Sequence, residues 1–413
     1  MNAEIIAVGS EMLTPSRVDT NSLYLTAELN ALGVEVVAKA VVGDDRERLA
    51  EMVRHAAARS PIVILTGGLG PTEDDVTREA VALALDRRLV FQPTILSAIE
   101  ERFRRLGRTM AEINRRQAFL VEGGEALANE RGTAPGQWIE DAGRYLMLLP
   151  GPPAELKPMF ERFCRPRLAR CVPPRLIRTL QLRIAGMGES DVDQLIAPIY
   201  RKYSNPVTTI LAKAGDIEVH FRAHAETEPE ALALLEAVAA PVEALLGDRI
   251  YSRDGAPLEA VVGRLLRERR ATLAVAESCT GGLLAERITS VPGASDYFAG
   301  GFVTYSRRMK IDLLGVSEEL LARHGAVSEP VAQAMASGAR FRAGAHYALA
   351  VTGVAGPSAG GESVPPGTVF LAVADSLGCE VVRRQFPGDR GRVRQFAAQT
   401  ALDLLRRRLL SAA

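Results

Sequence analysis

Residues 272–284, TLAVAESCTGGLL, place two potential nucleophiles directly after an apolar segment. The first five residues are apolar or β-branched and predict a short buried strand, whereas the last residues begin a helical pattern. Ser278 and Cys279 would therefore lie at a strand-to-helix turn, where unpaired helix N–H groups favour negative charge. Such a turn suits acyl transfer, with a nucleophile beside donors for a developing oxyanion. Capping of the helix by Ser278 or Thr280 is the alternative at this stretch alone.

Residues 66–77, TGGLGPTEDDVT, form a second turn with possible chemistry, after the apolar segment IVIL. Its glycines permit positive φ and close approach of the backbone to an anion. Two adjacent carboxylates follow, and they suit a metal ion that bridges a nucleotide or pyrophosphate. A glycine-rich turn with a capping Thr72 or Asp74 is the alternative. The candidate residues are Gly67, Gly68, Gly70 and Thr72 for the nucleotide, and Asp74 and Asp75 for the metal.

The elements around these turns alternate between strands and helices, which predicts mostly parallel sheets with helices on both faces. Ligands of such sheets bind beyond the carboxyl ends of the strands. Asn114, Pro150 and Gly151 fall on loops of the first sheet and are further candidates for nucleotide binding. The Arg-rich residues 101–116 predict a solvated helix pair, and the proline- and arginine-rich residues 164–175 predict a linker.

The middle of the chain predicts a compact β-α-β-β-α module of the KH type. Its turn GMGE, residues 186–189, lacks the second glycine of the GxxG loop and offers an acid where phosphate would bind. His220 and His224 share one strand face but have no third ligand, so they predict no metal site. A second linker is expected at residues 252–257, before the last α/β domain.

The composition is that of an ordinary globular protein, with 413 residues, 47% apolar and 24% charged. The length predicts two or three domains. Lys+Arg and Asp+Glu both number 50, and this balance does not favour nucleic acid as the main partner. Four scattered cysteines and the absence of a signal-peptide pattern or a long apolar run predict a reduced, cytoplasmic protein with no membrane contact.

Several stretches together resemble the competence/damage-inducible protein A (CinA) family over essentially the whole chain. In the first half they are TGGLGPTEDDVT, NRRQA, GTAPG and LPGPPAE. In the second half they are AESCTGG, TYSRRMK, GAVSE, VTGVAGP and PPGTV. The resemblance implies a multidomain α/β protein with three parts. They are a molybdopterin-binding-like domain at 1–170, a KH-like α+β domain at 175–251 and a C-terminal α/β amidase domain at 256–413.

The last domain is similar to nicotinamide mononucleotide (NMN) deamidases, which release ammonia and return nicotinate mononucleotide to NAD salvage. The first domain resembles ADP-ribose pyrophosphatases that depend on a divalent metal. The resemblance further implies a homodimer, and no cofactor for the amidase. Two alternatives stay open: nucleotidyl transfer of the molybdopterin type by the first domain, and a binding or scaffold role in DNA uptake, against which the zero net charge weighs.

The resemblance places the amidase nucleophile on Ser278, its basic partner on Lys310, and Tyr305 close to both. A desolvated lysine can act as the base of a serine hydrolase. Cys279 has no histidine partner in the loops of this domain and is expected to pack beneath the turn. The remaining substrate-binding candidates are Glu277, Thr280, Thr352, Gly353 and Arg392, with Gly281 and Gly282 as oxyanion donors.

The chain departs from the family pattern at two positions. Val364 stands where relatives often have a lysine, so any contact made by that lysine is absent. Residues 13–21, LTPSRVDTN, replace a loop that more usually contains glycine and glutamine.

Overall fold

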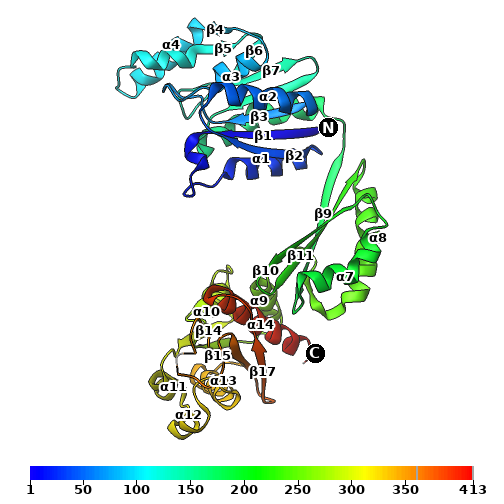
Figure 1. Ribbon diagram of the computed structural model, residues 1–413, viewed down its shortest axis with the longest axis vertical. Coiled ribbons are helices and arrows are strands. Elements are labelled where there is room, and N and C mark those ends of the chain that lie inside the picture. The colour runs from blue at the N-terminus through cyan, green and yellow to red at the C-terminus, as the bar shows by residue number, and fades with distance from the viewer. Residues whose placement is uncertain (360, 412–413) are drawn as a thin grey trace. The chain divides into compact units, whose positions relative to one another are not determined.

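The computed structural model describes residues 1–359 and 361–411, which fall into two compact units (Figure 1). Unit 1 comprises residues 1–178 and 223–232, and unit 2 comprises residues 179–222 and 233–413.

The main sheet of unit 1 has six strands in the order β2-β1-β3-β8-β7-β6. The first four run parallel, whereas β7 and β6 extend the sheet in antiparallel pairing. The strands are β1 (Asn2–Val8), β2 (Glu35–Val42), β3 (Ile62–Thr66), β6 (Gly124–Leu127), β7 (Gly136–Asp141) and β8 (Arg144–Leu149). A separate ladder pairs β4 (Leu89–Phe91) with β5 (Phe119–Val121). The predicted parallel sheet is therefore present.

Helices cover both faces of this sheet because its central strands are apolar on both sides. In β3, Val63 and Leu65 join the apolar cluster beneath α2 and α3, whereas Ile62 and Ile64 join the cluster beneath α1, α5 and α6. The helices are α1 (Thr20–Ala31), α2 (Arg46–Arg59), α3 (Thr77–Ala84), α4 (Pro93–Arg105), α5 (Pro153–Met159) and α6 (Arg165–Cys171). This arrangement fixes the loops at the carboxyl ends of β1, β3 and β8.

Two predictions for unit 1 are wrong. The expected linker at 164–175 contains helix α6, since Cys164, Leu168 and Val172 are spaced four residues apart and bury one helical face. The expected second helix after Gly107 is a short 3-10 helix, η2 (Glu112–Ala118). In both cases tertiary packing of a few apolar or polar side chains decided the local structure.

The KH-like module has the predicted β-α-β-β-α order, followed by one more strand. Its sheet has the strand order β10-β11-β9-β12. The elements are β9 (Leu176–Ala185), α7 (Glu189–Tyr200), β10 (Val207–Lys213), β11 (Asp216–Ala225), α8 (Glu228–Leu246) and β12 (Ile250–Ser252).

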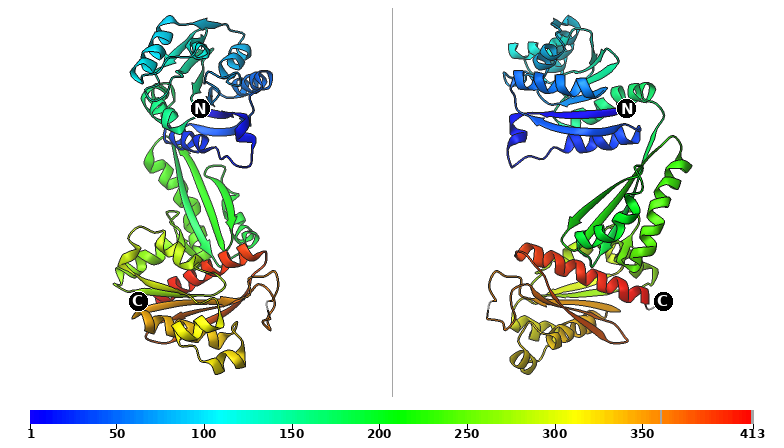
Figure 2. Two further views of the ribbon diagram at one scale, coloured as in Figure 1. Left: turned by 90° about the vertical axis from the view of Figure 1, so that its left-hand side faces the viewer. Right: turned by 45° about the vertical axis from the view of Figure 1, so that its right-hand side comes forward.

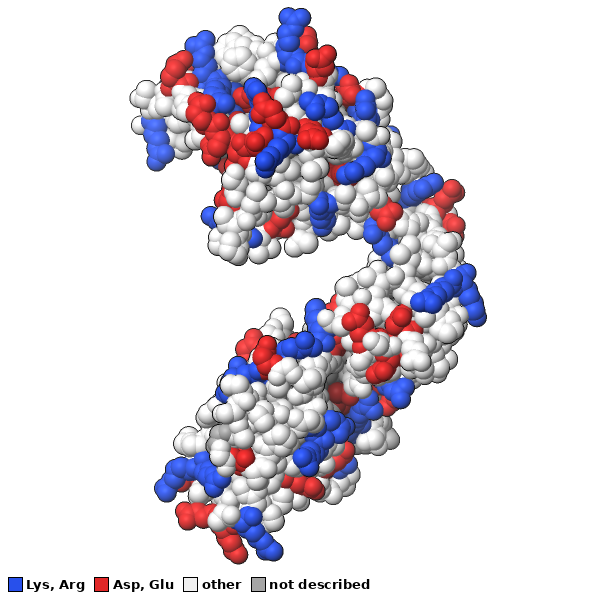
Figure 3. Space-filling view, viewed as in Figure 1, with Lys and Arg blue, Asp and Glu red and all other residues white. Residues whose placement is uncertain are grey.

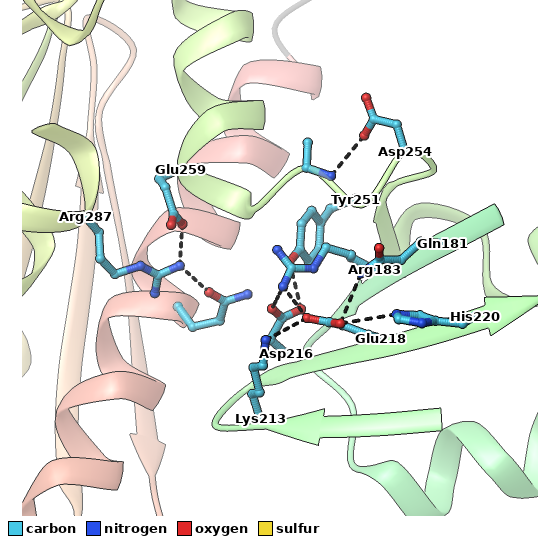
Figure 4. Close-up of polar contacts among 12 residues, drawn as sticks. Gln181, Arg183, Lys213, Asp216, Glu218, His220, Tyr251, Asp254, Glu259 and Arg287 are labelled. Atoms are coloured by element: carbon cyan, nitrogen blue, oxygen red, sulfur yellow. Dashed lines mark hydrogen bonds and ion pairs between the residues drawn. The ribbon is translucent and has the colours of Figure 1, made fainter. Parts of the chain in front are cut away.

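A buried ionic cluster lies at the end of this sheet within unit 2 (Figure 4). The Arg183 guanidinium lies 3.1 Å from the carboxylate of Asp216 and 2.5 Å from that of Glu218. The Tyr251 hydroxyl donates to Asp216 at 2.7 Å. Burial raises the pKa of Asp216. Burial alone would also raise the pKa of Glu218, but hydrogen bonds from Lys213 and Arg183 lower it to about 2. The cluster satisfies buried charges that would otherwise be costly.

The C-terminal part of unit 2 contains a five-stranded sheet in the order β14-β13-β15-β16-β17. The first three strands run parallel, and β16 and β17 form the predicted antiparallel hairpin. The strands are β13 (Leu273–Glu277), β14 (Phe298–Val303), β15 (Tyr347–Gly353), β16 (Thr368–Ala374) and β17 (Cys379–Gln385). The carboxyl ends of the three parallel strands therefore meet at one edge.

Side chains of β13 alternate between two apolar clusters, so helices pack on both faces. Leu273 and Val275 join the cluster with α9, α10 and α14, and Figure 2 shows α14 along that face. Ala274 and Ala276 join the cluster with α11, α12 and α13. The helices are α9 (Leu258–Glu268), α10 (Leu283–Thr289), α11 (Arg307–Leu314), α12 (Glu318–His324), α13 (Glu329–Ala343) and α14 (Arg390–Ser411).

Basic and acidic side chains interleave over the face shown in Figure 3, in keeping with the zero net charge. Among the described residues, no helix combines the length and apolar character that crossing a bilayer requires.

Candidate active site

The parallel strands of the C-terminal sheet bring three loops together at their carboxyl ends. Ser278 follows β13, Thr304 follows β14, and Gly353 ends β15. The Thr304 N–H donates to the Glu277 carbonyl at 2.7 Å, and the Ser278 N–H donates to the Val351 carbonyl at 2.9 Å. These bonds extend the ladder by one residue, so the position of Ser278 is set by the sheet.

Ser278 contacts the lysine predicted as its partner. The Lys310 ammonium donates to Ser278 Oγ at 2.9 Å and to the Thr304 carbonyl at 2.7 Å. Ser278 is 8% exposed and Lys310 is 1% exposed. Helix α11 holds the lysine in place, since Ser306 caps its first turn by accepting from the Met309 N–H. The structure thus joins the two residues, which lie 32 positions apart in sequence.

The environment of Lys310 lowers the pKa of its amine. Burial lowers the pKa of Lys310 to about 8, and the nearby Arg307 guanidinium lowers it further. The Cys279 thiol and the Glu362 carboxylate act in the opposite direction. With such a pKa, about one-tenth of the amine is unprotonated at pH 7 and can accept a proton from Ser278.

Cys279 is as buried as Ser278, but no described lysine or histidine donates to or accepts from its side chain. Its side chain is buried, and burial raises the pKa of the thiol to about 12. The thiol therefore stays protonated at neutral pH and lacks the nucleophilic thiolate. This geometry supports the sequence-based choice of serine over cysteine.

Glu277 is fully buried and belongs to the framework of the turn. Its carboxylate accepts hydrogen bonds from the N–H groups of Gly282 and Leu284 at 3.0 Å and of Ala285 at 2.8 Å. It thus occupies the positive end of helix α10, where an anion is favoured. Glu277 fixes the loop that carries Ser278 and does not line the neighbouring cavity.

The predicted oxyanion donors at Gly281 and Gly282 need correction. The Gly281 N–H donates to the Ser278 carbonyl at 3.1 Å, and that of Gly282 is held by Glu277, so neither is free. Thr280, predicted to bind substrate, is also buried and does not line the cavity at Ser278 and Lys310. By contrast, the Cys279 N–H donates to no acceptor on any other described residue. It directly follows Ser278, where serine hydrolases often place an oxyanion donor.

A cavity of about 300 Å³ opens in front of Ser278 and Lys310. Thr352 and Gly353 line it, as predicted, although the Thr352 hydroxyl already donates to the Ala326 carbonyl at 2.8 Å. Tyr305 lies at its rim with 60% of its surface exposed. The remaining polar lining residues are Arg307, Ser358, Glu362 and Arg390.

Arg390, not the predicted Arg392, reaches this cavity. Arg390 donates to the Tyr305 hydroxyl at 2.6 Å and to the Gly356 carbonyl at 3.1 Å. Arg392 instead lies over the Phe396 ring, 5.9 Å from its centroid. Both arginines belong to the first turn of α14, and only the helix phase decides which one faces the cavity. Arg307 and Glu362 were also missed: only Tyr305 and Lys310 were taken from the TYSRRMK motif that contains Arg307, and Glu362 lies outside the motifs.

The glycine-rich turn of unit 1 carries its own anion. Asp75 accepts from the N–H groups of Gly70 at 2.7 Å and Thr72 at 2.9 Å, and from the Thr72 hydroxyl at 2.5 Å. Asp74 is exposed, and a hydrogen bond from Thr72 lowers its pKa. Arg78, buried beneath the turn, donates to the Leu69 and Gly70 carbonyls at 2.8 and 2.9 Å.

These contacts leave little support for a metal site at Asp74 and Asp75. Both oxygens of Asp75 are already used within the turn. Among the described residues, no three or more His, Cys, Asp or Glu side chains are grouped to hold an ion. The divalent metal therefore stays a prediction from the family resemblance.

A cavity of about 390 Å³ lies beyond the carboxyl ends of β1 and β3. Of the predicted nucleotide-binding residues, only Gly151 lines it, and the buried Asn114 instead donates to Gln117 at 3.2 Å. Pro150 is buried at the end of β8. Asn21 was missed although it lines this cavity; it donates to the Gly151 carbonyl at 2.7 Å.

The fold and the Ser–Lys pair define a multidomain α/β protein with an enzyme-like site in its last domain. Three family models match consecutive ranges of the chain. They are the probable molybdopterin binding domain at residues 4–170, the damage-inducible protein CinA KH domain at 179–252 and the CinA C-terminal domain at 255–409.

A CinA-like protein of Solibacter usitatus is 66% identical over 99% of this chain and 98% of its own length. A CinA-like protein of Koribacter versatilis is 50% identical over 99% of this chain and its full length. A crystal structure of a CinA superfamily protein from Klebsiella pneumoniae is 38% identical and covers 37% of this chain and 96% of that one, with a TM-score of 0.37. The chain belongs to the CinA family, which confirms the resemblance and the fold class predicted from sequence.

We expect Cys279 to resist alkylation in the folded protein, since it is buried and its thiol is protonated. Iodoacetamide at neutral pH should modify the half-buried Cys171 long before Cys279, as peptide mass spectrometry would show. The same treatment in denaturant, as a control, should modify both. Fast modification of Cys279 in the folded protein would contradict its placement beneath the turn.

Proposed function

We propose that the C-terminal domain is an amidase that hydrolyses the carboxamide of a nicotinamide nucleotide, with NMN as its substrate. The observation that carries the proposal is the contact of 2.9 Å between Ser278 Oγ and the buried Lys310 amine. Serine alone is a weak nucleophile, and a neutral amine at this distance is the base that it needs. The resemblance to NMN deamidases supplies the substrate.

The residues support a two-stage reaction. Neutral Lys310 takes the hydroxyl proton while Ser278 Oγ forms a bond to the carboxamide carbon, and the resulting oxyanion accepts a hydrogen bond from the Cys279 N–H. The lysine then returns the proton to the amide nitrogen, the C–N bond breaks, and ammonia leaves. Lys310 then takes a proton from a water molecule as its oxygen attacks the resulting ester, and returns this proton to Ser278 Oγ as the ester bond breaks. The carboxylic acid product loses its own proton to solvent. Each step conserves protons through one amine.

Histidine is not available for this role among the described lining residues of the cavity. His346 lies at the other end of the sheet, where its Nδ1 contacts the Thr272 N–H at 3.1 Å. His324 ends helix α12. Lys310 is therefore the base that the geometry offers.

We predict that Ser278→Ala and Lys310→Met each reduce ammonia release from NMN by about ten-thousand-fold, because the pair acts as a unit. The double variant should lose little more. The exposed neighbour variant Arg308→Ala is the control and should keep near-normal turnover. Activity that survives in Ser278→Ala but disappears in Cys279→Ala would reverse the two roles. No ammonia from the wild-type protein would refute the proposed reaction.

The pH dependence follows from the Lys310 environment. Burial lowers the pKa of Lys310 to about 8, and only the neutral amine can accept the serine proton. Activity should therefore be lost as the pH falls through about 8 and should level off above it. Measurements of kcat/KM for NMN between about pH 6 and about pH 10 test this loss of activity at low pH. A profile that is flat down to about pH 6 would exclude Lys310 as the base.

A second proposal concerns unit 1, for which we propose binding and metal-dependent hydrolysis of ADP-ribose or a related nucleotide. The supporting observation is Asn21, which lines the cavity at the strand ends. Its Oδ1 is buried and has no hydrogen-bond partner among the described residues. An acceptor left unpaired in this way suits a ligand N–H or O–H.

Asn21→Ala should weaken ADP-ribose binding about tenfold, because the variant loses that acceptor. Titration calorimetry with and without Mg²⁺ measures the change. Leu23→Ala, on the exposed side of the same helix, is the matched control. Unchanged binding in Asn21→Ala would direct attention to another surface, and a wild-type protein that transfers a nucleotidyl group without hydrolysis would favour the transferase alternative.

A further inference from the structure

Glu362 introduces a negative charge into the cavity of Ser278 and Lys310. It is the one carboxylate among the described residues that line this cavity. Its side chain is only 18% exposed. Because it lies in the loop between β15 and β16, it reaches the site from a different segment than either Ser278 or Lys310.

The Glu362 carboxylate is only weakly neutralised. Its Oε1 accepts from the Arg307 guanidinium at 3.4 Å, which is long for a charge-assisted hydrogen bond. Its Oε2 accepts no hydrogen bond from any described residue. The Arg307 side chain is 55% exposed, so solvent weakens the attraction further. A half-buried carboxylate with only this one weak partner favours the binding of an additional cation next to it.

Positive groups occupy other parts of the same cavity. Arg390 donates to two neutral acceptors, the Tyr305 hydroxyl and the Gly356 carbonyl, so its charge is not cancelled there. The cavity therefore offers both a negative and a positive partner to one ligand. An N-substituted nicotinamide that carries a phosphate has the same two charges, a cationic pyridinium ring and an anionic phosphate.

We propose that Glu362 is the specificity residue that holds the cationic pyridinium ring and selects N-substituted nicotinamides over neutral carboxamides. This inference rests on the proposed amidase function. The scissile carboxamide is attached directly to the charged ring, so a ring that presents its carbonyl to Ser278 must bring its charge into this cavity. A buried cation without a counter-ion is unfavourable, and Glu362 supplies that counter-ion.

The carboxylate also acts on the base. Glu362 raises the pKa of Lys310, whereas Arg307 lowers it, and the Cys279 thiol is the remaining group that raises it. A bound pyridinium would offset Glu362 and so favour neutral Lys310 when substrate is present. Glu362 thus has an electrostatic effect that an uncharged isostere would lack.

The test compares NMN with its 1,4-dihydro form, which keeps the carboxamide, ribose and phosphate but has an uncharged ring. In Glu362→Gln, we expect KM for NMN to rise about tenfold, or about 1.4 kcal/mol. The Ki of the dihydro form, measured by its competition with NMN, should change less than about twofold. The acid limb of the kcat/KM profile should also shift to lower pH, because the carboxylate that raises the pKa of Lys310 is gone.

Glu319→Gln is the matched control, since Glu319 is an exposed acid on helix α12, outside the lining of the cavity. It should leave both constants and the profile unchanged. Equal changes for NMN and the dihydro form in Glu362→Gln would mean that Glu362 only shapes the cavity. No change for either ligand would mean that it only pairs with Arg307. Both results overturn the inference.

Failure of the proposed reaction gives a different result. A wild-type protein that releases no ammonia from NMN refutes the amidase, but calorimetric binding of NMN and the dihydro form still reports the ring preference. A wild-type preference for the cationic ring that Glu362→Gln abolishes supports the inference. Equal binding of the two ligands to the wild-type protein overturns it.

Discussion

The buried amine of Lys310 is the constraint on which the C-terminal site depends. No carboxylate lies within ion-pair distance of it among the described residues, and its two acceptors are the Ser278 hydroxyl and the Thr304 carbonyl. Keeping an ammonium there without a counter-ion is unfavourable, so burial lowers the pKa of Lys310 to about 8 and makes the neutral amine far more populated than in an exposed lysine. The same burial that costs stability therefore creates the base, and moving Lys310 toward solvent would restore an ordinary lysine.

The framework around this amine is rigid because each part is fixed by the sheet. Glu277 ends β13 and its carboxylate organises the start of α10, while its carbonyl accepts the Thr304 N–H. Thr304 in turn presents its carbonyl to Lys310. Ser278 directly follows β13, the strand between β14 and β15, and its N–H donates to the Val351 carbonyl of β15. A site built on strand ends in this way holds its groups more precisely than one built on long loops.

The structure could be predicted best where the apolar pattern of a segment and a family motif pointed to the same site. Strand β13 and the Ser278–Lys310 pair could be predicted, because an apolar run fixed the first and the family motifs fixed the second. The choice of Arg390 over Arg392 could not, since it depends on the rotation of α14 by packing. Glu362 and Asn21 were also beyond reach, because each acquires its meaning from segments distant in sequence. The role of α6 was hidden by its prolines and arginines, although its buried residues recur every four positions.

The two glycine-rich turns have one feature in common, a carboxylate of the chain that binds their backbone N–H groups. Each contains a carboxylate of the chain itself: Glu277 binds the N–H groups at the start of α10, and Asp75 binds those of Gly70 and Thr72. A carboxylate of the chain thus accepts hydrogen bonds from backbone N–H groups that could otherwise bind a phosphate. Backbone N–H groups beside the occupied ones, such as that of Cys279, are then the donors left for a ligand. In this chain each glycine-rich turn is therefore held by its own carboxylate, and a ligand is expected in the cavity next to the turn.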